Sequence, residues 1–420
     1  MNLLVVSQYF WPENFRINDL VRSLVKHKVH VDVLTGQPNY PDGKIFSGYT
    51  ATGFAAHDWH GATVQRVPLL PRGRGSALGL IGNYLSFVVS GILLAPFALR
   101  RKRVDVIFVY AISPILQVIP AIFLKWIKGA KLVIWVQDLW PDSLEATGFV
   151  RNRKLLGLVE ILVRWIYRHA DLILVQSEAF VAPVAALAEP GKIFYYPNSA
   201  DDVFFQQATQ QVSPVAGLRD GFSVVFAGNL GTAQSVETII AAAVLLQDQP
   251  HIRIVLVGDG SRAAWLKEEI ARLKLQNVSM AGQHPIEAMP AILHQAGALL
   301  VSLRDEAIFR QTVPSKLQAY LAMGRPIIAC LNGEGARIVM QAQAGIACTA
   351  DNAEALAAAI LEMSRFSEAE REQLGKNGLA YFQHHFDSAM LTRNLITHFE
   401  NLLTGSTGKK IINRPEKDSL

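Results

Sequence analysis

The feature that most constrains the fold is a repeated alternation of short apolar runs with helical patterns. The apolar runs are continuous and rich in Val, Ile and Leu, which is typical of parallel strands covered on both faces by helices. We expect strands at 3–10, 30–36, 104–110, 131–137, 172–177, 222–229, 252–260, 278–282, 297–303 and 326–331. Helical patterns lie between them, for example at 18–28, 235–246 and 263–275. This alternation predicts an α/β architecture of doubly wound parallel sheets with right-handed crossovers.

The alternation is interrupted once, between Ser199 and Phe222, where the sequence is polar, contains Pro and Gly and lacks periodicity. A chain of 420 residues can form two cores of ordinary size, so we interpret this stretch as an interdomain linker. The predicted parts are two Rossmann-like domains at 1–200 and 218–385, a helix at 386–403 that crosses back to the first domain, and a flexible tail at 404–420. Ligands bind beyond the carboxyl ends of the strands in such sheets, so we expect a cleft there.

Charge is unevenly distributed between the two predicted domains. Residues 1–200 carry 21 Lys and Arg against 13 Asp and Glu, whereas the remainder carries 19 against 22. This asymmetry indicates that the N-terminal domain faces an anionic partner. Nucleic acid is one such partner, but no nucleic-acid motif is present and aromatic residues do not alternate with the basic ones. We therefore expect no nucleic-acid partner.

Cysteine content and the start of the chain indicate a reducing compartment. The sequence contains two cysteines, Cys330 and Cys348, and neither belongs to a Cys or His cluster at metal-ligand spacing. We therefore expect no disulfide framework, no metal site and no cofactor. The opening residues MNLLVVSQYF lack the basic region and cleavage site of a signal peptide, and they are expected to form the first buried strand.

The stretch 78–103 has three possible interpretations. It holds about twenty residues without a formal charge, the length of a spanning helix, and it ends in Arg100, Arg101, Lys102 and Arg103. It could span a membrane, lie in the bilayer interface, or form an ordinary buried crossover helix. A spanning helix would split the sheet between two of its strands, so we prefer the other two interpretations. In the interfacial case the basic cluster would add attraction to an anionic surface.

Two glycine-containing loops of the C-terminal half are candidate phosphate sites. The strand at 222–229 runs through Gly228 and Asn229 into a helix whose free N–H groups favour an anion. The strand at 252–260 likewise ends in Gly258-Asp259-Gly260, without the full dinucleotide fingerprint. Ordinary βα turns would have the same pattern.

A third loop, at 304–316, carries cations that could add charge to a diphosphate site. Ser315 and Lys316 follow Pro314 where the loop becomes a helix, and Arg310 lies within the loop. Both cations could equally be solvated surface residues.

Polar residues also follow the predicted strands of the N-terminal half. Glu13, Asn14 and Arg16 follow the first strand, so they are candidate acceptor contacts, and Asn198 lies at the expected hinge. Gln137 and Asp138 begin at the carboxyl end of the strand at 131–137. Asp142 lies after a turn and is expected to be an N-cap.

Together these motifs resemble family 4 of the retaining GT-B glycosyltransferases over residues 1–400. The matching stretches are FAGNLGTAQSVETIIAA, VLVGDG, PSKLQAYLAMGRPII and YPNSADDVF. The stretches QYFWPENFRINDL, LTGQPNYPDGKIFSGY and WVQDLWPDSLEATG are similar to a subgroup that assembles bacterial O-antigen, capsule or exopolysaccharide, which includes N-acetyl-L-fucosaminyltransferases. The resemblance implies a GT-B fold, a UDP-sugar donor, a lipid-linked saccharide acceptor and a cytoplasmic location at the inner face of the bacterial cytoplasmic membrane.

The motifs and the resemblance together indicate which residues bind each substrate. Donor contacts are expected from Gly228, Asn229, Gln234, Gly258, Asp259, His284, Arg310, Ser315 and Lys316. Acceptor contacts are expected from Glu13, Asn14, Arg16, Asn39, Tyr40 and Asn198. Asp138 and Lys316 are the candidate catalytic residues, with Asp138 orienting the acceptor hydroxyl or the donor sugar.

Several positions depart from the family pattern. Asn229 and Gln234 stand where the family usually has Arg and Lys for the diphosphate. Gln311 and Ala319 stand where it has two glutamates, and Gln137 stands where many members have His. Two other functions therefore stay open: a GT-B sugar-nucleotide 2-epimerase, which would need no acceptor, and a non-catalytic subunit that binds nucleotide sugars.

Overall fold

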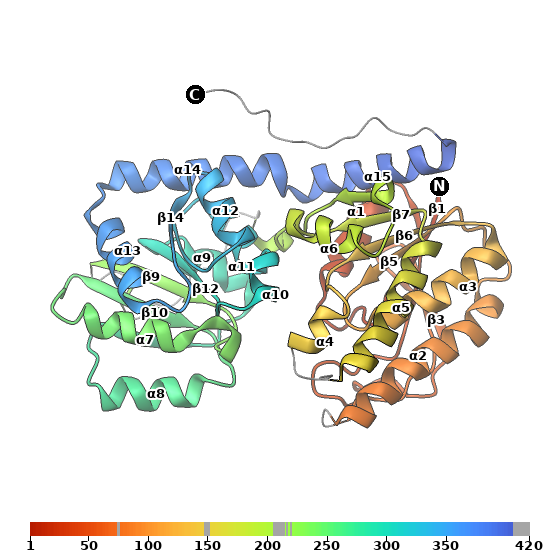
Figure 1. Ribbon diagram of the computed structural model, residues 1–420, viewed down its shortest axis with the longest axis horizontal. Coiled ribbons are helices and arrows are strands. Elements are labelled where there is room, and N and C mark those ends of the chain that lie inside the picture. Colours follow the sequence, from red (N-terminus) through yellow and green to blue (C-terminus); the bar gives the residue numbers. More distant parts are fainter. Residues whose placement is uncertain (74–75, 147–151, 205–214, 216, 219–220, 406–420) are drawn as a thin grey trace. The chain divides into compact units, whose positions relative to one another are not determined.

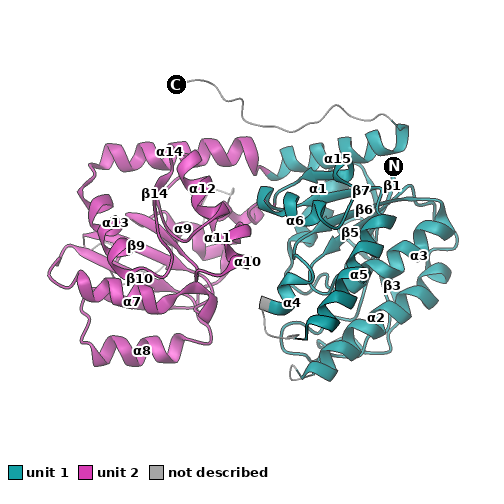
Figure 2. Ribbon diagram, in the orientation of Figure 1, with its two compact units in different colours: residues 1–197, 388–420 teal, residues 198–387 magenta. Residues whose placement is uncertain are grey.

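The computed structural model describes residues 1–73, 76–146, 152–204, 215, 217–218 and 221–405. Two compact units make up the chain, one of residues 1–197 and 388–420 and the other of residues 198–387 (Figure 2). Most of the predicted linker and all of the predicted tail beyond Gly405 lie outside the described residues.

The first unit, which Figure 1 shows in red to yellow-green with α15 in blue, is built on an eight-stranded sheet with the order β3-β4-β2-β1-β5-β6-β7-β8. Its strands are β1 (Asn2–Val6), β2 (His30–Thr35), β3 (Ala55–Trp59), β4 (Ala62–Arg66), β5 (Val106–Ala111), β6 (Lys131–Val136), β7 (Leu172–Val175) and β8 (Ile193–Tyr195). All neighbours are parallel except β3, which pairs antiparallel with β4 at the edge. In the centre, Val5 pairs with Val33 on one side and Phe108 on the other.

Helices cover both faces of this sheet, as continuous apolar strands require. They are α1 (Arg16–Lys26), α2 (Ala77–Ala98), α3 (Val118–Lys128), α4 (Asp142–Ala146), α5 (Arg153–His169), α6 (Val181–Ala185) and α15 (Ser388–Thr404). One core contains residues of α2, α3 and α5, and the other contains residues of α1 and α15. Phe399 of α15 meets Phe108 of β5 with ring centroids 5.6 Å apart. The last helix is thus part of the first unit.

The second unit is a six-stranded parallel sheet with the order β11-β10-β9-β12-β13-β14. Its strands are β9 (Phe222–Ala227), β10 (Ile252–Val257), β11 (Val278–Gly282), β12 (Ala298–Ser302), β13 (Ile327–Cys330) and β14 (Gly345–Cys348). Its helices are α7 (Val236–Leu245), α8 (Ala263–Arg272), α9 (Met289–Leu293), α10 (Ala307–Gln311), α11 (Ser315–Ala322), α12 (Glu334–Gln341), α13 (Ala353–Arg365) and α14 (Glu368–His385). This strand order is that of the Rossmann fold.

The predicted fold class is confirmed, and each of the ten predicted strands overlaps a strand of the structure. Most observed strands are shorter, and β1, β9 and β10 end early because the residues predicted at their carboxyl ends form the loops described below. The sequence reasoning missed β3, β4, β8 and β14. All four lie at or next to a sheet edge, and β8 and β14 have only three and four residues, so their apolar runs are short or broken. Asp142 is the first residue of α4 and not its N-cap.

Each parallel sheet has a point where its strand order reverses. In the first unit it lies between β1 and β5, and in the second between β9 and β12. Connections leave such strands in opposite directions and open a crevice beyond their carboxyl ends, where open α/β sheets bind ligands. The loops at these two points are therefore the first places to look for a site.

Candidate functional site

In the second unit, Gly228 directly follows β9 and Gly258 directly follows β10, and both have a positive φ angle that favours glycine. The φ angle is 126° at Gly228 and 134° at Gly258. A Cβ at Gly258 would lie 2.0 Å from the carbonyl oxygen of Gly228, and a Cβ at Gly228 would lie 3.0 Å from Cε of Lys316. The two glycines therefore let adjacent loops stack closely and let the lysine lie across the first loop.

Lys316 lies in the first turn of α11 and reaches the loop after β9. Its Nζ donates to Oε1 of Gln234 at 2.5 Å and lies 3.6 Å from the ring centroid of Phe226. Among the described residues, no carboxylate lies within 4.0 Å of this ammonium. Burial lowers the pKa of Lys316 from 10.5 to about 7. The lysine is therefore a half-buried cation without a counter-charge, a suitable partner for an anionic ligand.

The other predicted donor residues follow β9, β10 and β11 or begin α11. Asn229 is exposed beside Gly228, and Ser315 is exposed at the start of α11. Asp259 is exposed in the loop after β10 and accepts the N–H of Gly260 at 2.7 Å. His284 follows β11 at the sheet edge, with Nε2 3.2 Å from the oxygen of Ala281. The structure thus gathers Gly228, Asn229, Gln234 and Lys316, and it places His284 two strands from β9.

Arg310 is engaged elsewhere in the structure. Its guanidinium forms a bidentate ion pair with Asp305, with Nε–Oδ1 and Nη2–Oδ2 distances of 2.6 and 2.8 Å. The pair lowers the pKa of Asp305, and it leaves little net charge for a diphosphate. In this conformation Arg310 does not supply the charge expected of it.

Three charged residues near the start of α7 were not anticipated from the sequence. Oε1 of Glu237 lies 2.6 Å from Nη2 of Arg262 and 3.4 Å from Nη2 of Arg304. Nε of Arg304 also donates to the oxygen of Thr232 at 2.7 Å, which joins the loops after β9 and β12. Arg304 directly follows the predicted strand at 297–303, so the sequence could have indicated it as a site residue. The contact of Glu237 with Arg262 and Arg304 could be found only from the tertiary structure.

In the first unit, Glu13 organises the loop after β1. Its Oε1 accepts the N–H groups of Asn39 and Tyr40 at 2.8 and 2.7 Å, and its Oε2 accepts that of Phe10 at 3.2 Å. The side chain is 2% exposed, and burial raises its pKa. Glu13 therefore positions the loops, and its burial does not fit the predicted direct contact with an acceptor. Asn14 is exposed and Arg16 is half-buried, so both are accessible to a ligand.

A buried amide network connects this loop to α2. Asn39 Oδ1 accepts from Asn83 Nδ2 at 3.3 Å, and Asn83 Oδ1 accepts from Gln8 Nε2 at 2.7 Å. The N–H of Gln8 in turn donates to Oε1 of Gln117 at 2.9 Å, across the switch point. Asn39 is fully buried, so it also positions the site and does not fit a direct contact.

Three aromatic rings cluster in the same loops, and the outermost of them is Tyr40. Tyr9 stacks on Phe15 with centroids 5.3 Å apart, and both contact Tyr40 at 5.7 and 5.2 Å. Tyr40 is 40% exposed, so its ring remains accessible, and its contact with an acceptor stays a prediction. Faces of this kind pack against sugar rings and attract cations.

Asp138 connects the loops after β5 and β6. Its Oδ2 accepts the N–H of Ser113 at 2.7 Å, and Trp140 donates through Nε1 to the hydroxyl of Ser113 at 3.1 Å. Among the described residues, the other carboxylate oxygen of Asp138, Oδ1, has no hydrogen-bond partner. Asn198, the predicted hinge residue, is buried and is the first residue of the second unit.

Two family descriptions match most of the chain. Residues 14–199 match "Glycosyl transferase 4-like domain", and residues 221–365 match "Glycosyl transferases group 1". The chain is a family 4 glycosyltransferase of the GT-B fold. Its enzyme class is therefore the one indicated by the sequence resemblance.

Relatives of this glycosyltransferase carry related names. An Escherichia coli (strain K12) protein named as a colanic acid biosynthesis glycosyl transferase, WcaI, is 26% identical over 340 residues, which is 77% of this chain and 82% of that protein. The Pseudomonas aeruginosa glycosyltransferase WbjE is 24% identical over 67% of this chain and 73% of its own length. The structure of Anabaena Alr3699/HepE with UDP-glucose superposes with a TM-score of 0.67 over 96% of this chain and all of that chain, at 15% identity.

Helix α2 of the glycosyltransferase presents an unusual outer face. Its inner face packs in the sheet core through Phe87 and Ala95, which does not fit a helix surrounded by lipid. Its exposed large side chains are all apolar: Leu78, Ile81, Leu85, Val89, Leu93 and Phe97. By length and composition alone, α2 could cross a membrane, and it is the one such helix in the described part of the chain. Its packing instead fits a helix that covers the sheet.

Neighbouring helices extend this apolar face. Helix α3 contacts both α2 and α5, and the three lie side by side in Figure 1. Trp126 and Ile127 of α3 are 61% and 51% exposed, and Leu158 and Ile161 of α5 are 63% and 65% exposed. We call these α2, α3 and α5 residues the apolar face of the first unit.

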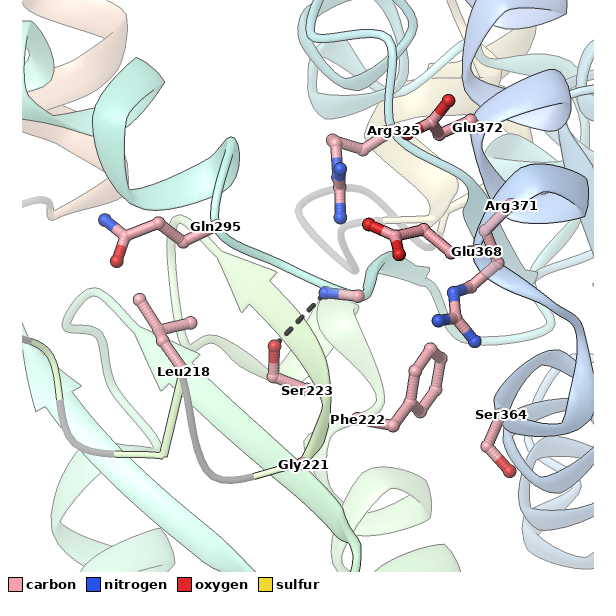
Figure 3. Close-up of a pocket in the computed structure, with 11 residues that line it drawn as sticks. Leu218, Gly221, Phe222, Ser223, Gln295, Arg325, Ser364, Glu368, Arg371 and Glu372 are labelled. Carbon is pink, nitrogen blue, oxygen red and sulfur yellow. Dashed lines mark hydrogen bonds between the residues drawn. The ribbon is translucent and has the colours of Figure 1, made fainter.

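A separate pocket of about 310 Å³ opens in the second unit, at the amino ends of its strands (Figure 3). Phe222 begins β9 there, Arg325 precedes β13, and Arg371 lies 5.3 Å from the Phe222 ring. The side chain of Glu368 lies between those of Arg325 and Arg371 in Figure 3. The pocket is at the edge opposite the glycine loops, so it is not the donor site. Among the described residues, no group of three His, Cys, Asp or Glu could hold a metal ion.

Proposed function

We propose that this glycosyltransferase moves a sugar, N-acetyl-L-fucosamine or a related one, from a UDP-linked donor to a lipid-linked saccharide with retention of configuration. The product would be a bacterial surface polysaccharide such as an O-antigen, a capsule or an exopolysaccharide. The name of WcaI supports a role in polysaccharide synthesis, and the Anabaena structure supports UDP as the carrier.

The main observation in support of the proposed donor site is the position of Lys316. Its ammonium contacts Gln234, the position where the family pattern has a lysine. Lys316 therefore restores from α11 the charge that the loop after β9 lacks. A donor diphosphate at this point would meet the ammonium and the free N–H groups at the start of α7, which together replace its water shell.

Catalysis would depend on positioning and on stabilisation of the leaving group. The bond between the sugar's anomeric carbon and the donor phosphate breaks, and the acceptor oxygen bonds to that carbon on the same face. The acceptor's proton passes to the leaving phosphate oxygen. Lys316 would stabilise the negative charge on the departing diphosphate, and the free oxygen of Asp138 would orient the acceptor hydroxyl.

The apolar face supports a membrane-held acceptor. A soluble protein normally places charged residues on the outer face of a surface helix. Here the outer face of α2 lacks them, and Arg100 and Arg101 follow at its carboxyl end and are exposed. An apolar surface with basic residues at its margin fits a bilayer interface with anionic lipids. We infer peripheral attachment at the cytoplasmic face of the bacterial membrane.

The test begins with a thermal-shift panel of nucleotide sugars, followed by transfer to lipid-linked oligosaccharides in a membrane extract. Lys316→Ala should lose most donor binding, whereas Lys267→Ala, an exposed lysine of α8, should behave as the parent protein. Isomerised nucleotide sugar without an acceptor would instead identify a 2-epimerase. Tight nucleotide binding without any turnover would identify a non-catalytic subunit, and unaffected transfer by Lys316→Ala would exclude the proposed role of this lysine.

A further inference from the structure

We propose that Arg72 binds the phosphate groups of the acceptor, as a diphosphate ester of a long apolar alcohol whose chain lies along the outer face of α2. This inference deepens the proposed function and rests on it, because it names the acceptor chemistry that the first unit recognises.

The guanidinium of Arg72 is held on aromatic faces. Its Cζ lies 5.1 Å from the ring centroid of Tyr40 and 5.9 Å from that of Tyr9. Among the described residues, no carboxylate lies within 4.0 Å of it and its side chain donates no hydrogen bond. Since a guanidinium offers five N–H donors, these two rings leave most of its capacity unused. The planar fork suits two oxygens of a phosphate or diphosphate.

A second arginine nearby shows the contrast. Arg66 is 3% exposed and donates through Nη1 to the oxygen of Gly36 at 2.7 Å and through Nη2 to that of Trp11. Its donors hold the loops together, so it has a structural role. Arg72 is half-buried and, within the described part of the chain, has no such partners, so its charge is available to a ligand.

The main chain of Arg72 is fixed by the buried amide network. Its N–H donates to Oδ1 of Asn39 at 3.1 Å, and the same oxygen accepts from Asn83 of α2. Asn39 and Asn83 are both fully buried. The backbone of Arg72 is therefore tied to α2 through Asn39 and Asn83, which reduces the backbone entropy lost when the arginine binds an anion.

The apolar face begins close to this cation. Leu70, two residues before Arg72, is 59% exposed, and Leu78 in the first turn of α2 is 82% exposed. From there the exposed apolar side chains continue to Phe97, along a helix about 33 Å long. A fixed cation at one end of a long uncharged face complements an amphiphile with an anionic head and an apolar chain.

The experiment measures binding of farnesyl diphosphate to the full chain by titration calorimetry. We expect Arg72→Ala to weaken this binding about tenfold or more, as loss of a charge-assisted hydrogen bond does. Binding of farnesol, which lacks the phosphates, should not change. Arg393→Ala removes the same charge from an exposed position on α15, away from α2, and should leave farnesyl diphosphate binding near the parent value.

Several results would overturn the assignment. An unchanged affinity in Arg72→Ala would do so, as would an equal loss of farnesol binding, which would indicate damage to the fold. If short-chain phosphatidylglycerol binds as tightly as farnesyl diphosphate, the site recognises a lipid headgroup instead. A UDP-sugar titration of the parent protein and of Arg72→Ala separates the two proposals. If the parent protein does not bind a UDP-sugar, the proposed function fails while the farnesyl diphosphate result still stands. If Arg72→Ala binds the UDP-sugar as the parent does but loses farnesyl diphosphate, the effect of Arg72 is confined to the acceptor.

Discussion

The pKa of Lys316 makes donor binding depend on pH in a defined direction. Burial holds the pKa of the free enzyme's lysine at about 7, and a bound diphosphate would raise it towards 10.5 because the anion favours the ammonium. The ammonium fraction of the free enzyme falls from about nine-tenths near pH 6 to about 3% near pH 8.5. Binding that needs the ammonium should therefore weaken about 30-fold across this range, which is about 2 kcal/mol.

Titration calorimetry of a UDP-sugar measures this effect directly, because the diphosphate diester keeps its charge over the whole range. Near pH 8.5 the parent protein should take up nearly one proton for each donor bound, which measurements in buffers of different ionisation enthalpy reveal. Lys316→Met should bind weakly at every pH and take up no proton, and Lys267→Ala should match the parent. An affinity that stays constant with pH in the parent, or a pH dependence that survives in Lys316→Met, would refute the reasoning.

Three further predictions concern stability, catalysis and membrane attachment. Gly258→Ala should lower the melting temperature and donor affinity together, because its Cβ would lie 2.0 Å from the oxygen of Gly228, and an unchanged melting curve would contradict this packing. Asp138→Asn keeps an oxygen that accepts the N–H of Ser113, so the melting temperature and the donor affinity should not change. Sugar transfer should nevertheless fall at least tenfold, because the carboxylate that orients the acceptor hydroxyl is lost. Full transfer activity would exclude a role of Asp138 in the reaction. Leu93→Lys, on a side chain 60% exposed, should reduce co-sedimentation with phosphatidylglycerol vesicles without unfolding the protein, and undiminished sedimentation would argue against the apolar face as the attachment site.

The lysine also illustrates how function and stability oppose each other. A lysine whose pKa is lowered in the folded state binds fewer protons there than in the unfolded chain. Between about pH 7 and 10.5 the folded state should therefore gain stability as the pH rises. The uncompensated cation costs stability in the empty enzyme, and an anionic donor would relieve that cost.

Sequence periodicity was sufficient to determine the α/β class, because buried parallel strands must be continuously apolar and their helices must have one apolar face. It also located the glycine loops, since strands that end in glycine and enter a helix are local patterns. Edge strands such as β3 and β14 were missed because short or half-exposed strands carry weak apolar signals. The strand order, and with it the two switch points, followed only from the pairing of distant segments.

The roles of individual side chains were decided by tertiary contacts. Glu13 follows the first strand as an acceptor contact would, yet three backbone N–H groups bury and occupy it. Arg310 is paired with Asp305, and Arg72, unremarked in the sequence, lies over two tyrosine rings without an ion pair to any described residue. The sequence by itself thus determined which chemical groups lie near the sheet edges. Only the tertiary structure decided which of them remain unpaired, because the partners that neutralise a charge or fill a hydrogen bond come from residues far apart in the chain.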